Sequence, residues 1–296
     1  MLALLLTALL VSENPVKAPN DFWAHWGDGR GEISSFKLTI PRYGELRQGY
    51  AVLIFVTEDI SRKTRIKVES DAIPKNERVP VLKLNRVFKF PTGIYDYSVM
   101  TSTFSSVEAE LGRPPLHPLK ISLTAQEWCG QVFHMLVPHE HELAINLHSY
   151  FEREGDQRRT IDLPENAIFE DNLPIWIREL RGEVMASGEY REVTIMPSLW
   201  DLRTKHEEAR FRQGWIRKED GGLIEVLGQK MPVWKWSWQI GDRTETYWVE
   251  KSGAQRIAKF SSSDGTEGIL QASLREAYWQ LNGNAAKTYR EKLKID

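Results

Sequence analysis

Cysteine is almost absent from this chain, because Cys129 is the only one among 296 residues. A single cysteine excludes an internal disulfide and a zinc site built from paired thiolates. No apolar run reaches the ~20 residues that a membrane-spanning helix needs, so we expect no transmembrane anchor. The chain also has no large excess of positive or negative charge, since 39 basic and 41 acidic residues are intermixed and give a net charge of −2. We therefore expect no nucleic-acid partner.

One apolar run, MLALLLTALLV at residues 1–11, has the length of the core of a secretory signal. Residues 12–20 read as a linker after it. No basic residue precedes the run, and Pro19 is a poor neighbour for a cleavage site. The alternative is an N-terminal core helix or strand. We predict a signal peptide at residues 1–18 and a periplasmic or secreted protein.

Apolar residues recur with a period of two through most of the first half, which is typical of β-strands. Aromatic residues, which suit half-buried strands, are prominent, with 11 Trp, 11 Phe and 9 Tyr. The pattern stops at the charged segment Arg153–Glu165, where we place a boundary. The sequence therefore predicts an N-terminal β subdomain at residues 19–160.

A second β subdomain is predicted at residues 161–296. It begins with a short helix at Asn172–Leu180, marked by an asparagine cap and an early proline. From Val233 onward, alternating segments separated by turns rich in Gly and Asp indicate an antiparallel meander. A final helix is predicted at Asn284–Leu293. The expected fold is mainly β, with antiparallel meander or half-barrel sheets in two subdomains and a few short helices.

The segment YWVEKSGAQRIAKFSSSDGTEGILQAS at Tyr247–Ser273 resembles exported bacterial meander proteins of the lipoprotein-carrier, or half-barrel, type. The segments FWAHWGDGRGEISSF, GIYDYSVMTSTF and QEWCGQVF resemble an uncharacterised family of exported bacterial proteins. The first resemblance implies a curved antiparallel sheet whose concave face holds an apolar ligand.

Tryptophan occupies alternate positions late in the chain, at Trp234, Trp236 and Trp238. Alternate residues of a strand share one face, and Trp248 and Trp279 would join this row from neighbouring strands. Exposed indoles in a concavity would bind a sugar ring or an acyl chain. The alternative is an aromatic core, which such residues form more often in half-buried sheets.

Four histidines lie close together, at His134, His139, His141 and His148. In an extended chain His139 and His141 would share a face, and with His148 they form a candidate metal site. The alternative, which we favour, is a solvated turn between two strands, because no HExxH spacing is present.

Cys129 lies in a strand-like segment, five residues before His134. Residues five apart in a strand face opposite sides, so this histidine would not activate the thiol. The sequence predicts a buried, inert cysteine.

Taken together, these patterns predict an exported envelope protein that binds an apolar or amphipathic ligand, a lipid or a glycan, or an envelope protein. We expect neither catalysis nor a cofactor. The alternative is a periplasmic metal-dependent hydrolase that uses the segment His134–His148.

Overall fold

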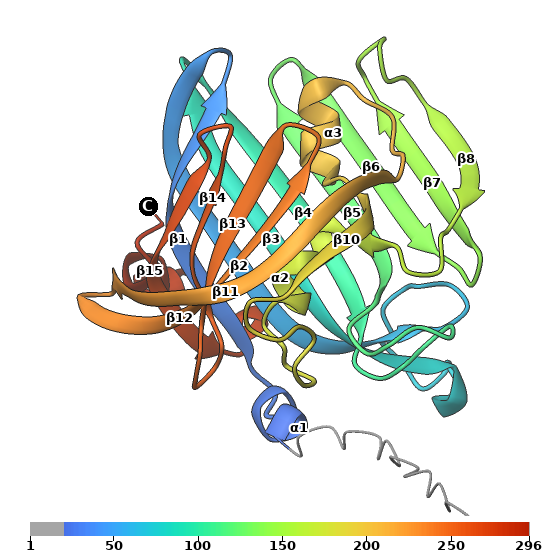
Figure 1. Cartoon of the computed structure of the whole chain (residues 1–296), viewed down its shortest axis with the longest axis horizontal. Helices are drawn as coiled ribbons and strands as arrows, with labels where there is room; N and C mark the ends of the chain where they lie inside the picture. Colours follow the sequence, from blue (N-terminus) through green and yellow to red (C-terminus); the bar gives the residue numbers. More distant parts are fainter. Residues whose placement is uncertain (1–20, 296) are drawn as a thin grey trace, which may run out of the picture.

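The computed structural model of this chain describes residues 21–295, so the predicted signal peptide lies outside the described residues. Within that range, fifteen strands form one sheet (Figure 1). Every neighbouring pair is antiparallel except β9 and β10, which are parallel. The strands of the first half are β1 (Gly31–Arg42), β2 (Glu45–Ser61), β3 (Arg78–Thr92), β4 (Tyr95–Ser106), β5 (Pro118–Glu127), β6 (Gly130–Pro138), β7 (Glu142–Ser149) and β8 (Gln157–Asp162). Those of the second half are β9 (Ile168–Phe169), β10 (Tyr190–Met196), β11 (Arg212–Val226), β12 (Gln229–Ile240), β13 (Arg243–Glu250), β14 (Ile257–Ser262) and β15 (Glu267–Glu276). The predicted mainly β, antiparallel fold is confirmed.

The two halves of the chain meet where the first strand pairs with the last. β1 is hydrogen-bonded to β15 from Gly31 opposite Glu276 to Thr39 opposite Glu267. The strands of the two expected subdomains therefore belong to one continuous sheet. The boundary segment Arg153–Glu165 contains the edge strand β8, and its linker-like charges suit a strand with one side open to solvent.

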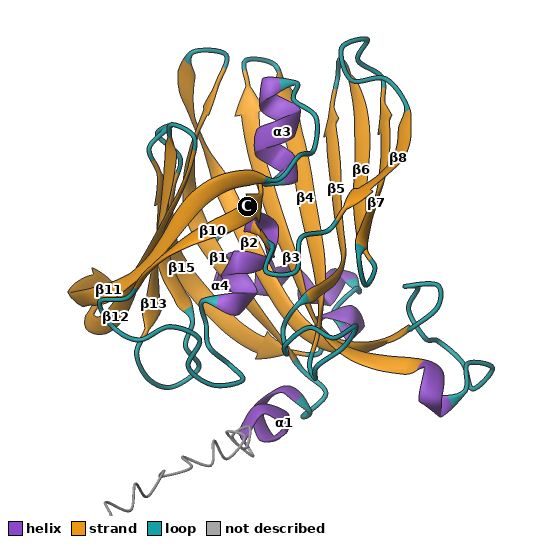
Figure 2. Cartoon of the chain, turned by 45° about the vertical axis from the view of Figure 1, so that its right-hand side comes forward, coloured by secondary structure: helices purple, strands orange, loops and turns teal. Residues whose placement is uncertain are grey.

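The sheet is rolled, and short helices lie within its hollow (Figures 1 and 2). α2 (Leu173–Trp176) and α3 (Leu199–Lys205) occupy the concave side, and the 3₁₀ turn η2 (Glu170–Asn172) leads into α2. η2 bonds directly to the sheet, because Thr103 Oγ1 donates to the carbonyl oxygen of Asp171 at 3.0 Å. The rolled sheet thus has an interior that is partly filled by its own chain.

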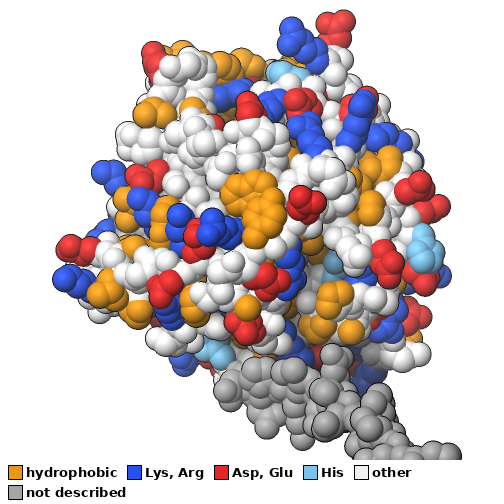
Figure 3. Space-filling view, in the orientation of Figure 1, with side chains coloured by type: hydrophobic (Ala, Val, Ile, Leu, Met, Phe, Trp, Pro, Cys, Tyr) orange, Lys and Arg blue, Asp and Glu red, His pale blue; other side chains and the backbone are white. Residues whose placement is uncertain are grey.

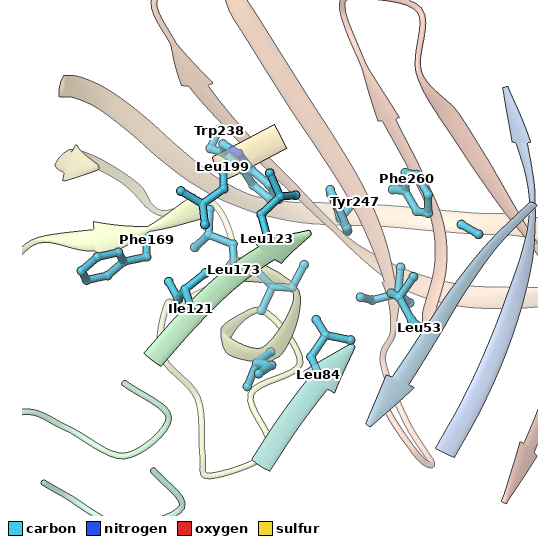
Figure 4. Packing of buried hydrophobic residues seen from close by; sticks show 14 of the residues in the cluster. Leu53, Leu84, Ile121, Leu123, Phe169, Leu173, Leu199, Trp238, Tyr247 and Phe260 are labelled. Atoms are coloured by element: carbon cyan, nitrogen blue, oxygen red, sulfur yellow. The ribbon is translucent and has the colours of Figure 1, made fainter. Parts of the chain in front are cut away.

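Side chains from both halves pack together in this interior, as expected when alternate residues of every strand face it. Figure 4 shows leucines of β2, β3 and β5 directed toward aromatic residues of β12, β13 and β14, with Leu173 and Leu199 of the helices between them. The labelled buried residues are Leu53, Leu84, Ile121, Leu123, Phe169, Leu173, Leu199, Trp238, Tyr247 and Phe260. The main apolar core therefore contains residues from both halves of the sheet.

The positions of the helices agree only in part with those predicted from the sequence. The helix predicted at Asn172–Leu180 is shorter, since α2 ends at Trp176. The C-terminal helix begins as a 3₁₀ turn, η4 (Asn284–Lys287), and continues as α4 (Thr288–Leu293). α3 was not predicted from the sequence, although Ser198 accepts a hydrogen bond from the Asp201 amide at 3.1 Å, a cap that the spacing Ser-x-x-Asp indicates. The other short helical elements are α1 (Asp21–Trp26), η1 (Lys75–Glu77) and η3 (Tyr278–Gln280).

Two sequence expectations concern membrane-spanning helices and the distribution of charge. No helix within residues 21–295 has the length and apolar character to cross a bilayer. On the face shown in Figure 3, Lys and Arg side chains are interspersed with Asp and Glu side chains.

Candidate functional site

A cavity of about 410 Å³ opens on the concave side of the sheet, next to α3. Inward-facing residues near the ends of β1, β3, β12, β13 and β14 line it, together with one face of α3. Its volume lies within the roughly 300–1,000 Å³ typical of small-molecule sites. The cavity has an aromatic wall and a charged wall.

The aromatic wall runs across three adjacent strands. Trp238 of β12 stacks with Tyr247 of β13, with ring centroids 4.9 Å apart, and Tyr247 stacks with Phe260 of β14 at 5.5 Å. Phe88 of β3 stacks on Phe260 at 6.2 Å from the opposite part of the sheet. Tyr247 and Phe260 are direct cross-strand partners, so their rings must share the concave face. The result is a continuous apolar surface.

The charged wall is centred on Arg243, which is buried. Its Nη2 lies 2.6 Å from Glu170 Oε2, its Nε lies 3.2 Å from Asp201 Oδ1, and its Nη1 contacts Glu245. Glu170 also accepts a hydrogen bond from Trp238 Nε1 at 3.0 Å, which joins the charged wall to the aromatic wall. Buried charges need partners of this kind, and here each oxygen of Glu170 is engaged.

Asp171, the neighbour of Glu170 in η2, helps to hold α3 beside the cavity. Asp171 accepts hydrogen bonds from Arg86 Nη2 at 2.7 Å and from the Leu199 amide at 2.8 Å. Burial raises the pKa of Asp171 to about 6, although the guanidinium of Arg86 acts in the opposite direction. The Ser198 amide likewise donates to Glu170, at 2.7 Å. The acidic residues of η2 therefore position both α3 and the two arginines.

Among the carboxyl groups that line the cavity, Glu245 has the most strongly raised pKa. Burial raises its pKa to about 8, while Arg243 acts in the opposite direction and Glu170 adds like-charge repulsion. Because an unfolded glutamate titrates near 4.3, the folded protein holds a proton between about pH 4.5 and 8 that the unfolded chain releases. Stability should therefore fall as pH rises through this window.

We expect Glu245→Gln to remove this contribution, which is at most about 1.4 kcal/mol per pH unit. The variant should gain more than about 1 kcal/mol relative to wild type between pH 5 and pH 8, as measured by urea unfolding at both values. Glu267→Gln, at a partly exposed carboxylate paired with Lys259, should keep the wild-type dependence. Parallel stability curves for Glu245→Gln and wild type would contradict the expectation.

The five tryptophans of the predicted row do not form one surface. Trp236 is buried against Trp176, 6.0 Å away, and Trp234 packs between Lys218 and Lys251. Trp248 is the cross-strand partner of Lys235 and so faces the opposite side of the sheet, and Trp279 lies in η3. Of the five, Trp238 borders the cavity. Alternation within β12 was predicted, but which indoles are covered depends on segments distant in sequence.

The candidate histidines lie at different places along β6 and β7. His139 and His141 are exposed in the turn between these strands, whereas His148 is near the far end of β7, roughly 20 Å away at 3.3 Å per residue. His134 faces the interior, where burial lowers its pKa to about 4. Among residues 21–295 no three His, Cys, Asp or Glu side chains lie in an arrangement that would hold a metal ion.

Cys129 is exposed, in contrast to the buried thiol that was predicted. Glu127 pairs with Gly130, so Trp128 and Cys129 form a two-residue hairpin loop instead of continuing a strand. A hydrogen bond with the Glu127 carboxylate raises the pKa of the Cys129 thiol, which disfavours the nucleophilic thiolate.

The charged wall was not predicted from the sequence. Its members on β13, Arg243 and Glu245, occupy the same alternation as the buried residues Tyr247 and Val249. Extending that period toward the start of the strand would have placed both charges on the concave face.

Comparisons with known proteins return a structural likeness but no sequence family. No family model matches the sequence, and no curated protein matches it. Among solved structures the chain is similar to a β-barrel-like protein of Domain of Unknown Function DUF1849 from Brucella abortus, with 12% identity and a TM-score of 0.49. The match covers 83% of this chain and 98% of that chain. The likeness of Tyr247–Ser273 to lipoprotein carriers has no counterpart in these comparisons.

Proposed function

We propose that the protein binds an amphipathic small molecule, non-covalently, in the cavity beside α3. The observation that carries the proposal is the continuous aromatic wall of Trp238, Tyr247 and Phe260 facing an array of charged side chains. Apolar walls with a few placed polar groups are typical of small-molecule sites. We propose further that the protein works in the periplasm or outside the cell, because the apolar run at residues 1–11 has the length of a signal core.

Of the two ligand classes expected from sequence, a lipid suits the cavity better than a glycan. A sugar needs several hydrogen-bond donors and acceptors, whereas Glu170, Asp201 and Arg243 are already engaged with one another. An acyl chain needs only apolar surface, which the stacked rings supply. The ligand proposed here therefore has an apolar body.

Blocking the cavity should abolish binding. Thr204 of α3 lines the cavity, and Thr204→Trp would place an indole in the space that the ligand's body needs. We expect protein purified without detergent to carry a lipid in native mass spectrometry, and Thr204→Trp to lack it. Thr39→Trp, on the opposite face of β1, is the matched control and should keep the lipid.

Two results would overturn the proposal. One is wild-type protein that neither carries a lipid nor binds added decanol or decanoate in calorimetric titrations. The other is binding that Thr204→Trp leaves unchanged, which would place the ligand elsewhere.

A further inference from the structure

Three of the four basic side chains that line the cavity have carboxylate partners. Arg86 pairs with Asp171 at 2.7 Å, Arg243 pairs with Glu170, and Lys205 lies 3.2 Å from Asp201 Oδ1. Arg42 is the fourth, and its hydrogen-bond partners are phenols. Within residues 21–295 no carboxylate lies within ion-pair distance of it. The cavity thus contains one cation whose charge the described protein leaves uncompensated.

Arg42 is held in place from several sides. It is the last residue of β1 and follows Leu38 and Ile40 on the concave face. Its Nε and Nη2 donate to Tyr97 Oη at 3.2 and 3.1 Å. Its guanidinium lies over the Tyr43 ring, 4.4 Å from the centroid, and 6.0 Å from the ring of Trp200. Such aromatic contacts fix a guanidinium without neutralising it.

The fixed position leaves hydrogen-bonding capacity free. A guanidinium has five N–H donors in a planar fork, and in the described part of the chain Arg42 Nη1 donates none. Tyr43, the residue beside it, adopts a left-handed backbone with φ of 56° in the β1–β2 turn and hydrogen-bonds Tyr97 at 2.6 Å. A non-glycine residue in this conformation is uncommon, and here it places the phenol next to the arginine.

We propose that Arg42 binds the anionic head group, a carboxylate or a phosphate, of a ligand whose apolar body lies along the aromatic wall. The inference rests on the proposed function and adds the chemistry of the head group. Arginine suits both anions because its fork matches two of their oxygens at once. The expected ligand class is therefore a fatty acid or a lipid phosphate, in preference to a neutral or cationic amphiphile.

Four probes with the same ten-carbon tail test this: decanoate, decyl phosphate, decanol and decyltrimethylammonium, each titrated calorimetrically below its aggregation concentration. We expect wild type to bind decanoate about tenfold or more tightly than decanol, since charge-assisted hydrogen bonds are the strong ones. Decyl phosphate should match or exceed decanoate. Arg42→Gln should lower the affinity for decanoate to about that for decanol, and Arg42→Lys should restore only part of the preference.

The control is Arg217→Gln, an exposed arginine of β11 that pairs with Glu219 and does not line the cavity. It should keep the full preference for decanoate. Equal affinity of wild type for all four probes would overturn the role of Arg42 and leave the proposed function standing. A preference that persists in Arg42→Gln would also overturn it, whereas failure of every probe to bind to a protein that also carries no lipid would overturn the proposed function itself.

Discussion

Replacing Trp236 with alanine is expected to lower the free energy of unfolding by about 3–5 kcal/mol, the range for removing a large buried aromatic side chain. The indole is buried, packs against Trp176 at 6.0 Å and lies beneath Lys218 Nζ, 5.3 Å from its ring centroid. Alanine would leave a cavity that the surrounding strands cannot close. Urea unfolding of the variant beside wild type measures the loss.

Two further variants separate burial from other effects. Trp236→Phe should cost less, because it keeps most of the ring and removes an Nε1–H that has no hydrogen-bond partner among the described residues. Trp279→Ala, at a side chain that is 46% exposed, should change stability by less than about 1 kcal/mol. Similar small losses for Trp236→Ala and Trp279→Ala would show that Trp236 lies on an accessible surface.

Arg178→Met is expected to cost about 3–5 kcal/mol, because it would leave the buried carboxylate of Glu32 without its partner. Arg178 follows α2, is fully buried and donates from both Nη atoms to Glu32 at 2.9 Å. It also donates to the carbonyl oxygens of Ala254 and Gln255, at 2.7 and 2.9 Å. A single side chain thus connects the helical segment, β1 and the turn between β13 and β14.

The double variant Arg178→Met/Glu32→Leu distinguishes the unpaired charge from lost packing. An apolar replacement of both partners should recover a large part of the loss, since no charge then remains buried. The exposed pair Arg217–Glu219 is the comparison, and Arg217→Met should cost no more than about 1 kcal/mol. If the double variant is no more stable than Arg178→Met, the carboxylate is not the cause of the loss.

The strands could be predicted because their signal is local. Alternation from Val233 onward, with turns at Gly241 and Gly253, depends only on residues close in sequence, and the structure has strands and turns there. The pairing of β1 with β15 has no such signal, because any exposed strand edge offers the same backbone hydrogen bonds. Local patterns therefore indicate two groups of strands, but they do not indicate that these groups join in one sheet.

The candidate site was harder to predict because its residues act through partners distant in the chain. The alternation of β13 places Arg243 and Glu245 on the concave face, but Glu170, the partner of Arg243, lies in η2, more than 70 residues earlier in the chain. The tryptophan row illustrates the same difficulty. Alternation places Trp236 and Trp238 on one face, but only the tertiary structure decides that Trp236 is covered while Trp238 borders a cavity.

The pairing of β1 with β15 constrains when folding of the sheet can be completed. During synthesis β1 to β8 emerge first and can pair as successive hairpins, while the free edge of β1 remains open. The hydrogen bonds of that edge form only when β15, the last strand of the described residues, has emerged. Until then the nascent chain carries an unpaired, apolar strand that can associate with other chains. Folding to completion is therefore a late, cooperative event that requires almost the whole sequence.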